Sequence, residues 1–414
     1  MKIFTLGLFI AAAGFAAAGC KVPNYSDSTC SGYLGCSSGQ QVGPIRNDEY
    51  GIKYLGPDNS VKAGLGCGMP VPDGTPRTIP GSAKGYMQFT VMGTGENLTD
   101  TPDPARKGPR SFWVRVPADY DPSKPYPLIY IGQGCGSYNA ANTSTLPLFK
   151  GNEEAIYVAL DIPTDGANMN CYDNEAGLKS QEWEAFQLFT DFVDSHYCVD
   201  TNRIYVAGYS TGGWLANMWG CAFGGVVDPK FSNPRKFAPN YHVRAQASVS
   251  GGEPSEQPPC GPVAAFWLSD TMDNANKIAL NKSALARVGR TNDCPTDYDD
   301  NSIQTDWHDE NTAIGAGICK RFTKCPADYP VVFCTSVGLG HASQDDRATA
   351  AMTLFFGLLA PGANPNNNGM TVTPTGGTTG SDAGAGGATG TDGSAATGGS
   401  TGTGGSTGTG GSGV

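Results

Sequence analysis

The sequence contains a serine in a setting that could make it a nucleophile. Residues 208–212 read "GYSTG", with Ser210 at the centre and a glycine two positions to either side. An apolar, β-branched run precedes this stretch and a helical pattern follows it, so the serine falls at a strand-to-helix turn. Only glycine tolerates the close backbone approach of so sharp a turn, which presents the hydroxyl at the helix N-terminus. The pattern predicts a nucleophile elbow, whereas the same five residues elsewhere would be an ordinary tight turn.

A serine nucleophile needs a general base, and the chain contains four histidines. His196, His242 and His308 lie at a helix end, in a polar loop and in a charged loop, where we expect surface or capping roles. His341 instead follows an apolar strand directly. It lies on the glycine-rich loop "VGLGH", which can bring the imidazole over the edge of a sheet. We predict that His341 is the base.

Two candidate acids follow the strand pattern "VAAFWL", between the serine and the histidine. The chain order serine, acid, histidine is typical of α/β-hydrolases. Either Asp270 or Asp273 could orient the imidazole and stabilise its cationic form, and the other aspartate would cap a turn. Spacing alone leaves both open.

An oxyanion hole would complete the chemistry with two backbone N–H groups. One is that of Thr211, the residue after the serine, and the other comes from a loop after an early strand. The stretch "PLIYIGQGCGSYN" supplies such a loop, and its N–H candidate is Cys135. A glycine-rich loop could otherwise bind phosphate. The chain has no G-x-x-x-x-G-K-S/T motif, and the glycine spacing does not fit G-x-G-x-x-G, so nucleotide binding is not expected.

The elements that must position these residues alternate between strands and helices. Apolar runs with helices in the crossovers predict an α/β fold with a mostly parallel central sheet covered on both faces. Such sheets carry their sites at the carboxyl ends of the strands. The expected strands are "SFWVRVP", "PLIYIG", "AIYVALDI", "RIYVAG", "RAQASVS", "VAAFWL" and "YPVVFCT", and the expected helices are "SQEWEAFQLFTDFVDSHY", "TGGWLANMWGC" and "DDRATAAMTLFFGLL".

Charge and the N-terminal residues bound the partners and the compartment. With 27 basic and 38 acidic residues, the chain has no basic stripe for a phosphate backbone, so nucleic acid is not an expected partner. The apolar run near the N-terminus is short for a membrane span and ends in the small residues of an export signal. The stretch "AAGC" resembles a bacterial lipobox that would lipidate Cys20. Excluding Cys20 leaves an even number of the 13 cysteines for disulfides, with ordinary secretion as the alternative.

The chain divides into four expected segments. Residues 1–20 form the export signal of a secreted or cell-surface bacterial protein, and residues 21–66 form a polar tether. Residues 67–361 form the α/β domain. The Gly/Thr/Ser-rich residues 362–414 cannot bury enough apolar surface to fold, so we expect a disordered spacer. We expect a monomer that contacts membranes only through a lipid anchor.

Five motifs in one order carry a family resemblance: "VPADYDPSKPYPLIYIGQGCGS", "HYCVDTNRIYVAGYSTGGWLANMWGC", "FWLSDTMDN", "TNDC" and "YPVVFCTSVGLGH". From Cys67 to Leu359 the chain resembles the secreted feruloyl esterases and the related polyhydroxybutyrate-depolymerase-like esterases. The resemblance implies the disulfide-rich α/β-hydrolase fold and a serine carboxylic ester hydrolase without metal or cofactor. Its implied substrate carries ferulic-type acids on plant cell-wall polysaccharide, with polyhydroxyalkanoate or another aryl or alkyl ester as the alternative.

The resemblance also selects one acid and exposes two departures. In these esterases the acid ends an H-G-T-x-D pattern, which matches "SDTMD" and implies Asp273. The His-Gly of the oxyanion loop is Gln133-Gly134 here, and the His-Gly before the acid is Ser269-Asp270. These departures bear on substrate preference and loop geometry more than on the chemistry.

Disulfides are a further implication of the resemblance. Cys198 precedes the elbow strand and Cys221 ends the elbow helix, and the strand and helix have similar lengths, so the two could meet at the bottom of the sheet. Cys135 with Cys171 is a second candidate pair. A crowded set holds further candidates, although the sequence does not define their connectivity: Cys294, Cys319, Cys325 and Cys334.

Two other functions remain open at this point. A surface binding protein that kept a hydrolase scaffold without catalysis belongs to a different class, and an intact serine, acid and histidine in order argue against it. A serine peptidase on the same fold is the third possibility. Trp214, Trp267 and Trp307 lie near the motifs and could form an aromatic wall, but we expect core packing for at least two of them.

Overall fold

The computed structural model describes residues 52–77, 85–99, 101–104, 107–136, 154–163, 171–228, 230, 235–253, 257–307, 319–361 and 363. All of them lie in the first of two compact units, Met1–Thr371. The expected export signal with Cys20, most of the expected tether and nearly all of the expected tail lie outside the described residues.

The helices and strands follow one another as β1 (Tyr54–Leu55), β2 (Met87–Gly93), β3 (Gly108–Arg115), β4 (Tyr126–Gly132), β5 (Ile156–Leu160), η2 (Asn174–Lys179), α1 (Glu182–His196), β6 (Val199–Tyr209), α2 (Thr211–Ala222), β7 (Val226–Val227), β8 (Val243–Val249), β9 (Ala264–Asp270), α3 (Ile278–Thr291), η3 (Asn301–Ile303), β10 (Gln304–Asp306), β11 (Cys319–Phe322), β12 (Val331–Ser336) and α4 (Asp345–Gly357).

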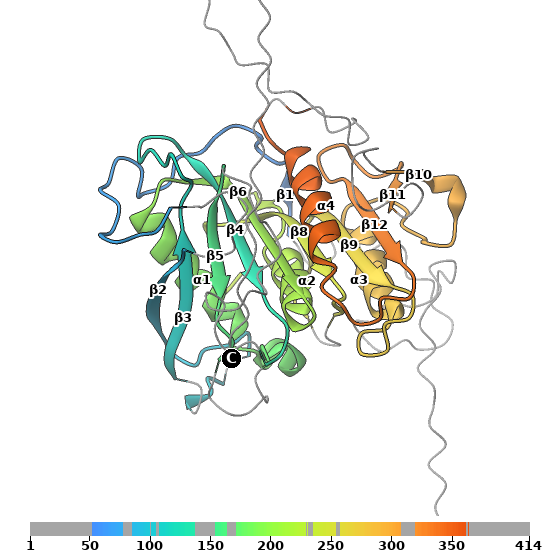
Figure 1. Ribbon diagram of the computed structural model, residues 1–414, viewed down its shortest axis with the longest axis horizontal. Helices are drawn as coiled ribbons and strands as arrows, with labels where there is room; N and C mark the ends of the chain where they lie inside the picture. Colours follow the sequence, from blue (N-terminus) through green and yellow to red (C-terminus); the bar gives the residue numbers. More distant parts are fainter. Residues whose placement is uncertain are drawn as a thin grey trace, which may run out of the picture. The chain divides into compact units, whose positions relative to one another are not determined.

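A 10-stranded mixed sheet organises the domain, in the order β10-β11-β12-β9-β8-β6-β4-β5-β3-β2 (Figure 1). Its centre, from β12 to β5 in this order, runs parallel. The strands at both edges pair antiparallel. The mostly parallel central sheet expected from the sequence is thus confirmed. Because the carboxyl ends of parallel strands meet at one edge, the segments after β4, β6, β9 and β12 converge there.

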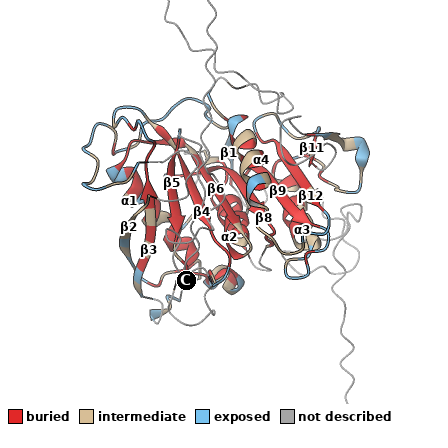
Figure 2. Cartoon of the chain, in the orientation of Figure 1, coloured by how far each residue is buried: buried red, intermediate tan, exposed pale blue. Residues whose placement is uncertain are grey.

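Helices cover both faces of the sheet, and alternate strand residues pack against them in two separate cores. Tyr130 of β4 packs with the first core, to which α1, α2 and α3 contribute. Its neighbours Ile129 and Ile131 pack with the second core, where Met352 and other residues of α4 lie. The strands β5, β8 and β9 are buried over their whole length, and β4 and β6 over nearly all of it (Figure 2).

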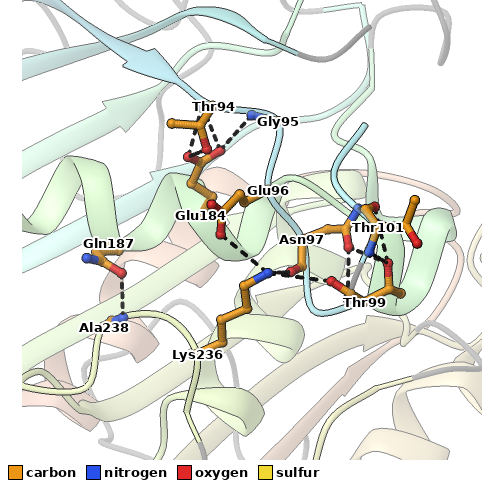
Figure 3. A network of polar contacts seen from close by, with 10 residues as sticks. All are labelled: Thr94, Gly95, Glu96, Asn97, Thr99, Thr101, Glu184, Gln187, Lys236 and Ala238. Carbon is orange, nitrogen blue, oxygen red and sulfur yellow. Dashed lines mark hydrogen bonds and ion pairs between the residues drawn. The ribbon is translucent and has the colours of Figure 1, made fainter. Parts of the chain in front are cut away.

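A polar network holds the loop after β2 against α1 and the segment at residues 236–238 (Figure 3). Glu184 of α1 accepts hydrogen bonds from the backbone N–H groups of Thr94 and Gly95, at 2.9 and 3.2 Å. The Lys236 ammonium donates to the carbonyl oxygen of Asn97 at 2.7 Å. These contacts join α1 and Lys236 to the loop that follows β2, the strand at the antiparallel edge of the sheet.

Residues 52–66 contact the domain, although the sequence placed them in the polar tether. Tyr54 and Leu55 pair with β7, and the side chain of Ile52 is buried. The N–H of Gly64 donates to the carbonyl of Val199 at 2.8 Å, at the start of β6. The described part of this segment is therefore packed structure, because its backbone groups find partners on the amino side of the sheet.

Five disulfides connect described residues, and they correct one expectation. Cys198 bonds to Cys67, and Cys221 bonds to Cys260, so the expected Cys198–Cys221 pair is wrong. Cys198 and Cys221 thus each bond to a cysteine in a loop from another part of the chain. The expected Cys135–Cys171 pair is confirmed. The crowded set resolves into two bonds, Cys294–Cys325 and Cys319–Cys334.

Candidate active site

The backbone at Ser210 adopts the strained geometry of a nucleophile elbow. Its φ and ψ are 56° and −120°, a region that a non-glycine residue rarely occupies. A Cβ on Gly208 would lie 2.2 Å from the carbonyl oxygen of Gly212. A Cβ on Gly212 would lie 2.1 Å from the carbonyl carbon of Gly132 in β4. Both glycines of the "GYSTG" stretch are therefore required for the turn to close against the neighbouring strand.

Hydrogen bonds to two neighbouring strands stabilise the elbow. The N–H of Ser210 donates to Val249 at the end of β8, at 3.0 Å. The N–H of Gly212 donates to the carbonyl of Gln133, just past β4, at 2.8 Å. The serine thus lies at the N-terminus of α2, held between the carboxyl ends of β4 and β8.

His341 lies between the serine and an aspartate. Its Nε2 is 2.8 Å from the Oγ of Ser210, and its Nδ1 is 2.8 Å from Oδ2 of Asp273. A carboxylate only accepts hydrogen bonds, so Nδ1–H donates to Asp273 and Nε2 is left to accept from the serine hydroxyl. The side chain of Asp273 is buried, while that of His341 is 26% exposed. The arrangement is open to a substrate on the serine side and closed on the aspartate side.

The carboxylate of Asp273 is oriented by its own loop. Its second oxygen, Oδ1, accepts from the N–H groups of Ala275 and Asn276, at 2.9 and 2.8 Å. Both carboxylate oxygens are thereby engaged, one by the loop and one by the imidazole. The carboxylate therefore has a fixed orientation toward Nδ1 of His341.

Asp270 takes a different position, so only one of the two candidate acids contacts the histidine. Its Oδ1 accepts from the N–H of Met272 at 2.8 Å, and its Oδ2 accepts from the Ser336 hydroxyl at 2.7 Å and from the N–H of Leu339 at 3.0 Å. Burial opposes ionisation of Asp270, but these hydrogen bonds outweigh it and lower the pKa of the carboxyl. Asp270 caps a turn, as expected for the second aspartate, and also bonds to a second loop.

The loop that carries His341 contacts the elbow strand and the residue after β8. The hydroxyl of Tyr209 donates to the carbonyl of His341 at 3.2 Å, and its ring lies 5.2 Å from the imidazole. The Ser250 hydroxyl donates to the carbonyl of Ala342 at 3.2 Å. The histidine is therefore held by its backbone on one side and by Asp273 on the other.

The glycine-rich loop after β4 passes directly beside the nucleophile. A Cβ on Gly134 would lie 3.5 Å from the Cβ of Ser210. The N–H of Gln133 already donates to the hydroxyl of Tyr172, at 3.2 Å. Within the part of the chain that the structure describes, the N–H groups of Thr211 and Cys135 have no hydrogen-bond acceptor. The N–H of Thr211, next to Ser210, is therefore open to another acceptor, as is that of Cys135, next to Gly134.

The segment after Cys171 supports this side of the site, and the sequence analysis missed its role. Tyr172 donates to the carbonyl of Leu160 at 2.8 Å while it accepts from the glycine-rich loop. The amide of Asn174 donates to the carbonyl and hydroxyl oxygens of Thr211, at 2.7 and 2.9 Å. The expected Cys135–Cys171 bond was the available signal, because it brings residues 171–174 to the oxyanion loop.

The other expected aromatic and histidine positions take no part in the hydrogen bonds between the side chains of Ser210, His341 and Asp273. Trp267 and Trp307 are fully buried in the core, as expected for at least two of the tryptophans, and Trp214 is partly exposed. His196 is exposed and bonds to the carbonyl of Phe192 at the end of α1, while His242 is buried. His308 lies outside the described residues.

The described residues show neither a metal centre nor a membrane-spanning helix. They contain no group of three His, Cys, Asp or Glu side chains placed to hold a metal ion. None of the helices in the described ranges is long and apolar enough to traverse a bilayer.

Strand order, elbow and the contacts of Ser210, His341 and Asp273 define the α/β-hydrolase fold. The chain is similar to feruloyl esterase B of Piromyces equi, with 24% identity over 257 residues. That match covers 58% of this chain and 44% of the relative. It is also similar to feruloyl esterase D of Neurospora crassa, with 28% identity over 205 residues, which covers 45% of this chain and 60% of the relative. The chain thus matches about half the length of these relatives, and no family model matches it.

Solved structures with a similar chain course include further esterases. A ferulic acid esterase from Anaeromyces mucronatus, solved without substrate, aligns at a TM-score of 0.40 and 14% identity, covering 75% of this chain and 99% of that chain. The feruloyl esterase module from Clostridium thermocellum complexed with sinapinate aligns at a TM-score of 0.37 and 15% identity, covering 72% of this chain and 95% of that one.

Proposed function

We propose that the protein is a serine carboxylic ester hydrolase that releases ferulic-type acids from plant cell-wall polysaccharide. The observation that carries this proposal is the position of His341, 2.8 Å from Ser210 and 2.8 Å from Asp273. A histidine so placed can take the proton of the serine hydroxyl while the aspartate stabilises the imidazolium that forms. The similarity to feruloyl esterases supports the ferulate ester as substrate.

The proposed reaction has two halves. Ser210 transfers its proton to His341 as Oγ attacks the ester carbonyl, and the N–H groups of Thr211 and Cys135 stabilise the negative oxygen. His341 then returns the proton to the departing alcohol, and an acyl-enzyme remains. Water, deprotonated by the same histidine, attacks the acyl-enzyme and releases the acid. No step requires a metal or cofactor.

The replacement of a histidine by Gln133 in the oxyanion loop is compatible with this chemistry. The position acts here through its backbone, since its carbonyl accepts from Gly212 and its N–H donates to Tyr172. The stabilising donors of the proposed oxyanion hole are also backbone groups. The side chain at this position can therefore differ without removing a donor from the site.

Exposed apolar side chains beside the triad favour an ester with an apolar part. Met272, next to Asp273, is 60% exposed, and Leu339, two residues before His341, is 48% exposed. Val337, on the same loop, is 76% exposed. An aromatic acid such as ferulate could cover such surface, and so could a polyhydroxyalkanoate chain, which is the alternative substrate.

The nucleophile is tested by Ser210→Ala, which should lower kcat on methyl ferulate by about 10⁴- to 10⁶-fold because the triad acts as a unit. Ser195→Ala, on the exposed end of α1, is the matched control and should leave kcat unchanged. A variant at Ser210 that keeps more than about a tenth of the activity would contradict the mechanism. Absence of labelling by a fluorophosphonate would favour a non-catalytic binding protein.

Substrate choice is tested by a screen with methyl ferulate, a short polyhydroxybutyrate oligomer and acetylated xylan. We expect the highest kcat/KM on methyl ferulate. A higher value on the oligomer would reassign the substrate to polyesters. Failure on all esters together with cleavage of a peptide would favour the serine peptidase.

The proposed location is the cell surface, through a lipid on Cys20. When expressed in a bacterium with its own leader, the protein should enter the detergent phase, because acyl chains contribute about 0.8 kcal/mol per buried CH₂. Cys20→Ser should move it to the aqueous phase without changing kcat. Recovery of the unmutated protein in the aqueous phase would leave simple secretion.

A further inference from the structure

The two loops that carry Asp273 and His341 begin side by side. Asp270 ends β9 and Ser336 ends β12, and the two residues face each other in the parallel pairing of these strands. The N–H of Thr271 donates to the carbonyl of Ser336 at 2.9 Å. Beyond this bond the strands stop pairing, so other contacts must hold the loops in register.

The carboxylate of Asp270 provides these contacts. One oxygen binds the N–H of Met272 on its own loop, at 2.8 Å. The other oxygen binds the hydroxyl of Ser336 and the N–H of Leu339 on the histidine loop, at 2.7 and 3.0 Å. Asp270 is fully buried, so water does not compete for these bonds. One side chain thus joins both loops.

The histidine loop has few other constraints between β12 and His341. Gly338 and Gly340 have φ values of 85° and 64°, in the left-handed region that glycine adopts most readily. Val337 and Leu339 expose their side chains, so apolar burial contributes little to holding this segment. A four-residue segment of this kind gains its definite shape from the bonds to its backbone.

We propose that Asp270 is a positioning residue, which fixes the loop of His341 relative to that of Asp273 and so maintains the distance from Nε2 to the serine hydroxyl. This inference rests on the proposed function of the triad. A carboxylate is suited to the task because it accepts on two oxygens at once. An amide has one acceptor and places an N–H₂ group against a donor, and alanine removes both acceptors.

The test compares Asp270→Asn and Asp270→Ala with Asp121→Asn. Asp121 makes the same local turn, accepting from the N–H of Ser123 at 2.8 Å, but it lies on an exposed loop before β4 and joins no second loop. A misplacement of reacting groups near 1 Å costs about 10²-fold, so Asp270→Ala should lower kcat by about 10- to 100-fold. Asp270→Asn should lose less, and Asp121→Asn should lose nothing. KM should stay within about threefold for all three variants, because binding surface is retained.

Two further measurements separate positioning from general damage to the fold. The amide protons of Leu339 and Gly340 should exchange faster in Asp270→Ala, while those of α2 should not change. Ser336→Ala removes one partner of the same oxygen and leaves the carboxylate in place, so it should lower kcat by a smaller factor. If Asp270→Ala failed to fold, this milder variant would carry the test.

The outcomes distinguish this inference from the proposed function. Equal rates of fluorophosphonate labelling at Ser210 in the wild type and in both Asp270→Ala and Ser336→Ala would overturn the positioning role. A wild type that reacts with the probe but leaves methyl ferulate intact would overturn the substrate alone. A wild type that does not react with the probe would overturn both. A fall of kcat matched by Asp121→Asn would assign the effect to the turn and overturn the inference.

Discussion

Asn174 donates from one amide group to both the carbonyl and the hydroxyl oxygen of Thr211, at 2.7 and 2.9 Å. Thr211 is the first residue of α2, where a backbone N–H has no partner within the helix. Asn174 comes from η2, outside the sheet, so a distant segment orients the first peptide groups of the elbow helix. Asn174 therefore constrains Thr211, whose N–H is one donor of the proposed oxyanion hole.

Replacing Asn174 should weaken the proposed oxyanion hole. Loss of a single donor in such a site costs about 10²- to 10³-fold in kcat, and loosening a donor should cost less. We expect Asn174→Ala to lower kcat on methyl ferulate by about tenfold with little change in KM. Asn202→Ala is the matched control, because this buried amide binds the carbonyl of Ser60 near the start of β6. Equal losses in both variants would indicate a stability effect only.

The aspartate beside His341 should matter more than any other acid. In Asp273→Asn the amide oxygen stays with the N–H groups of Ala275 and Asn276, so the N–H₂ group faces Nδ1 of His341. The imidazole is then held in the wrong tautomer, at a cost of about 10⁴ in kcat. Steady-state kinetics on methyl ferulate measure this loss, and circular dichroism checks that the fold is retained. A larger loss in Asp270→Asn than in Asp273→Asn would reverse the two roles.

Mild reduction should act first on the disulfide beside the site. Cys135 is exposed and Cys171 is partly exposed, whereas Cys319 and Cys334 are buried in the second core. A small thiol without denaturant should therefore open Cys135–Cys171 first and lower kcat, since the loop of Gly134 loses a covalent support. Alkylation followed by mass spectrometry reports which cysteines are open. Loss of activity before alkylation at Cys135 would show that another bond is responsible.

The exposed apolar side chains should affect binding more than chemistry. Leu339→Ser keeps the backbone N–H that binds Asp270 but removes apolar surface beside the triad. We expect KM for methyl ferulate to rise by about three- to tenfold, because burying part of a leucine side chain contributes about 1 kcal/mol. KM for methyl acetate should not change. Leu65→Ser is the control, because this leucine is 77% exposed near the amino end of β6. Equal effects on both substrates would contradict contact with the aromatic part.

Acid should destabilise the fold partly through His242. Burial, with the positive charges of Arg235, Arg244 and Lys62, lowers the pKa of His242 to about 3, against a small opposing effect of Asp58. The unfolded chain binds a proton at this residue below about pH 6.5, where the folded chain does not. The stability from its neutral form is complete above that pH and is lost as the pH falls toward 3. This residue should lower the free energy of unfolding by at most about 1.4 kcal/mol per pH unit in this range.

Urea unfolding between pH 7 and pH 4 measures this slope. His242→Gln should flatten the decline of the free energy of unfolding, because the variant has no group to protonate there. His196→Gln, on the exposed end of α1, should leave the slope as it is. An unchanged slope in His242→Gln would assign the acid sensitivity to other groups.

The central strands and the elbow could be predicted because their signals are local. Strands such as β5 and β9 are buried on both faces and consist mostly of apolar residues. The strand β2 was missed because it alternates in exposure and lacks the continuous apolar run by which the central strands were identified. The strand β11 is short and contains charged residues. The helix α3 was missed although its buried residues recur at the spacing of one helix face, because two of them, Asn281 and Gly289, are not apolar side chains.

The site could be predicted only as far as order along the chain allows. Ser210 and His341 each follow a strand within a recognisable glycine-rich stretch, so their positions near the sheet edge could be inferred. Asp270 and Asp273 follow the same strand within four residues of each other, and only the course of the turn after β9 decides which one reaches the imidazole. The predicted Cys198–Cys221 bond was wrong for a related reason. Several loops lie at the amino ends of the strands, and sequence spacing does not show which of them contacts Cys198.

The segment around Gly64 contacts the opposite end of β6 from Ser210. The N–H of Gly64 binds Val199, at the first residue of β6, and Ser210 follows the last residue of the same strand. A strand of 11 residues spans roughly 35 Å at about 3.3 Å per residue. A label or a surface attached at this segment would therefore lie about one strand length from Ser210 and would leave access to the serine open.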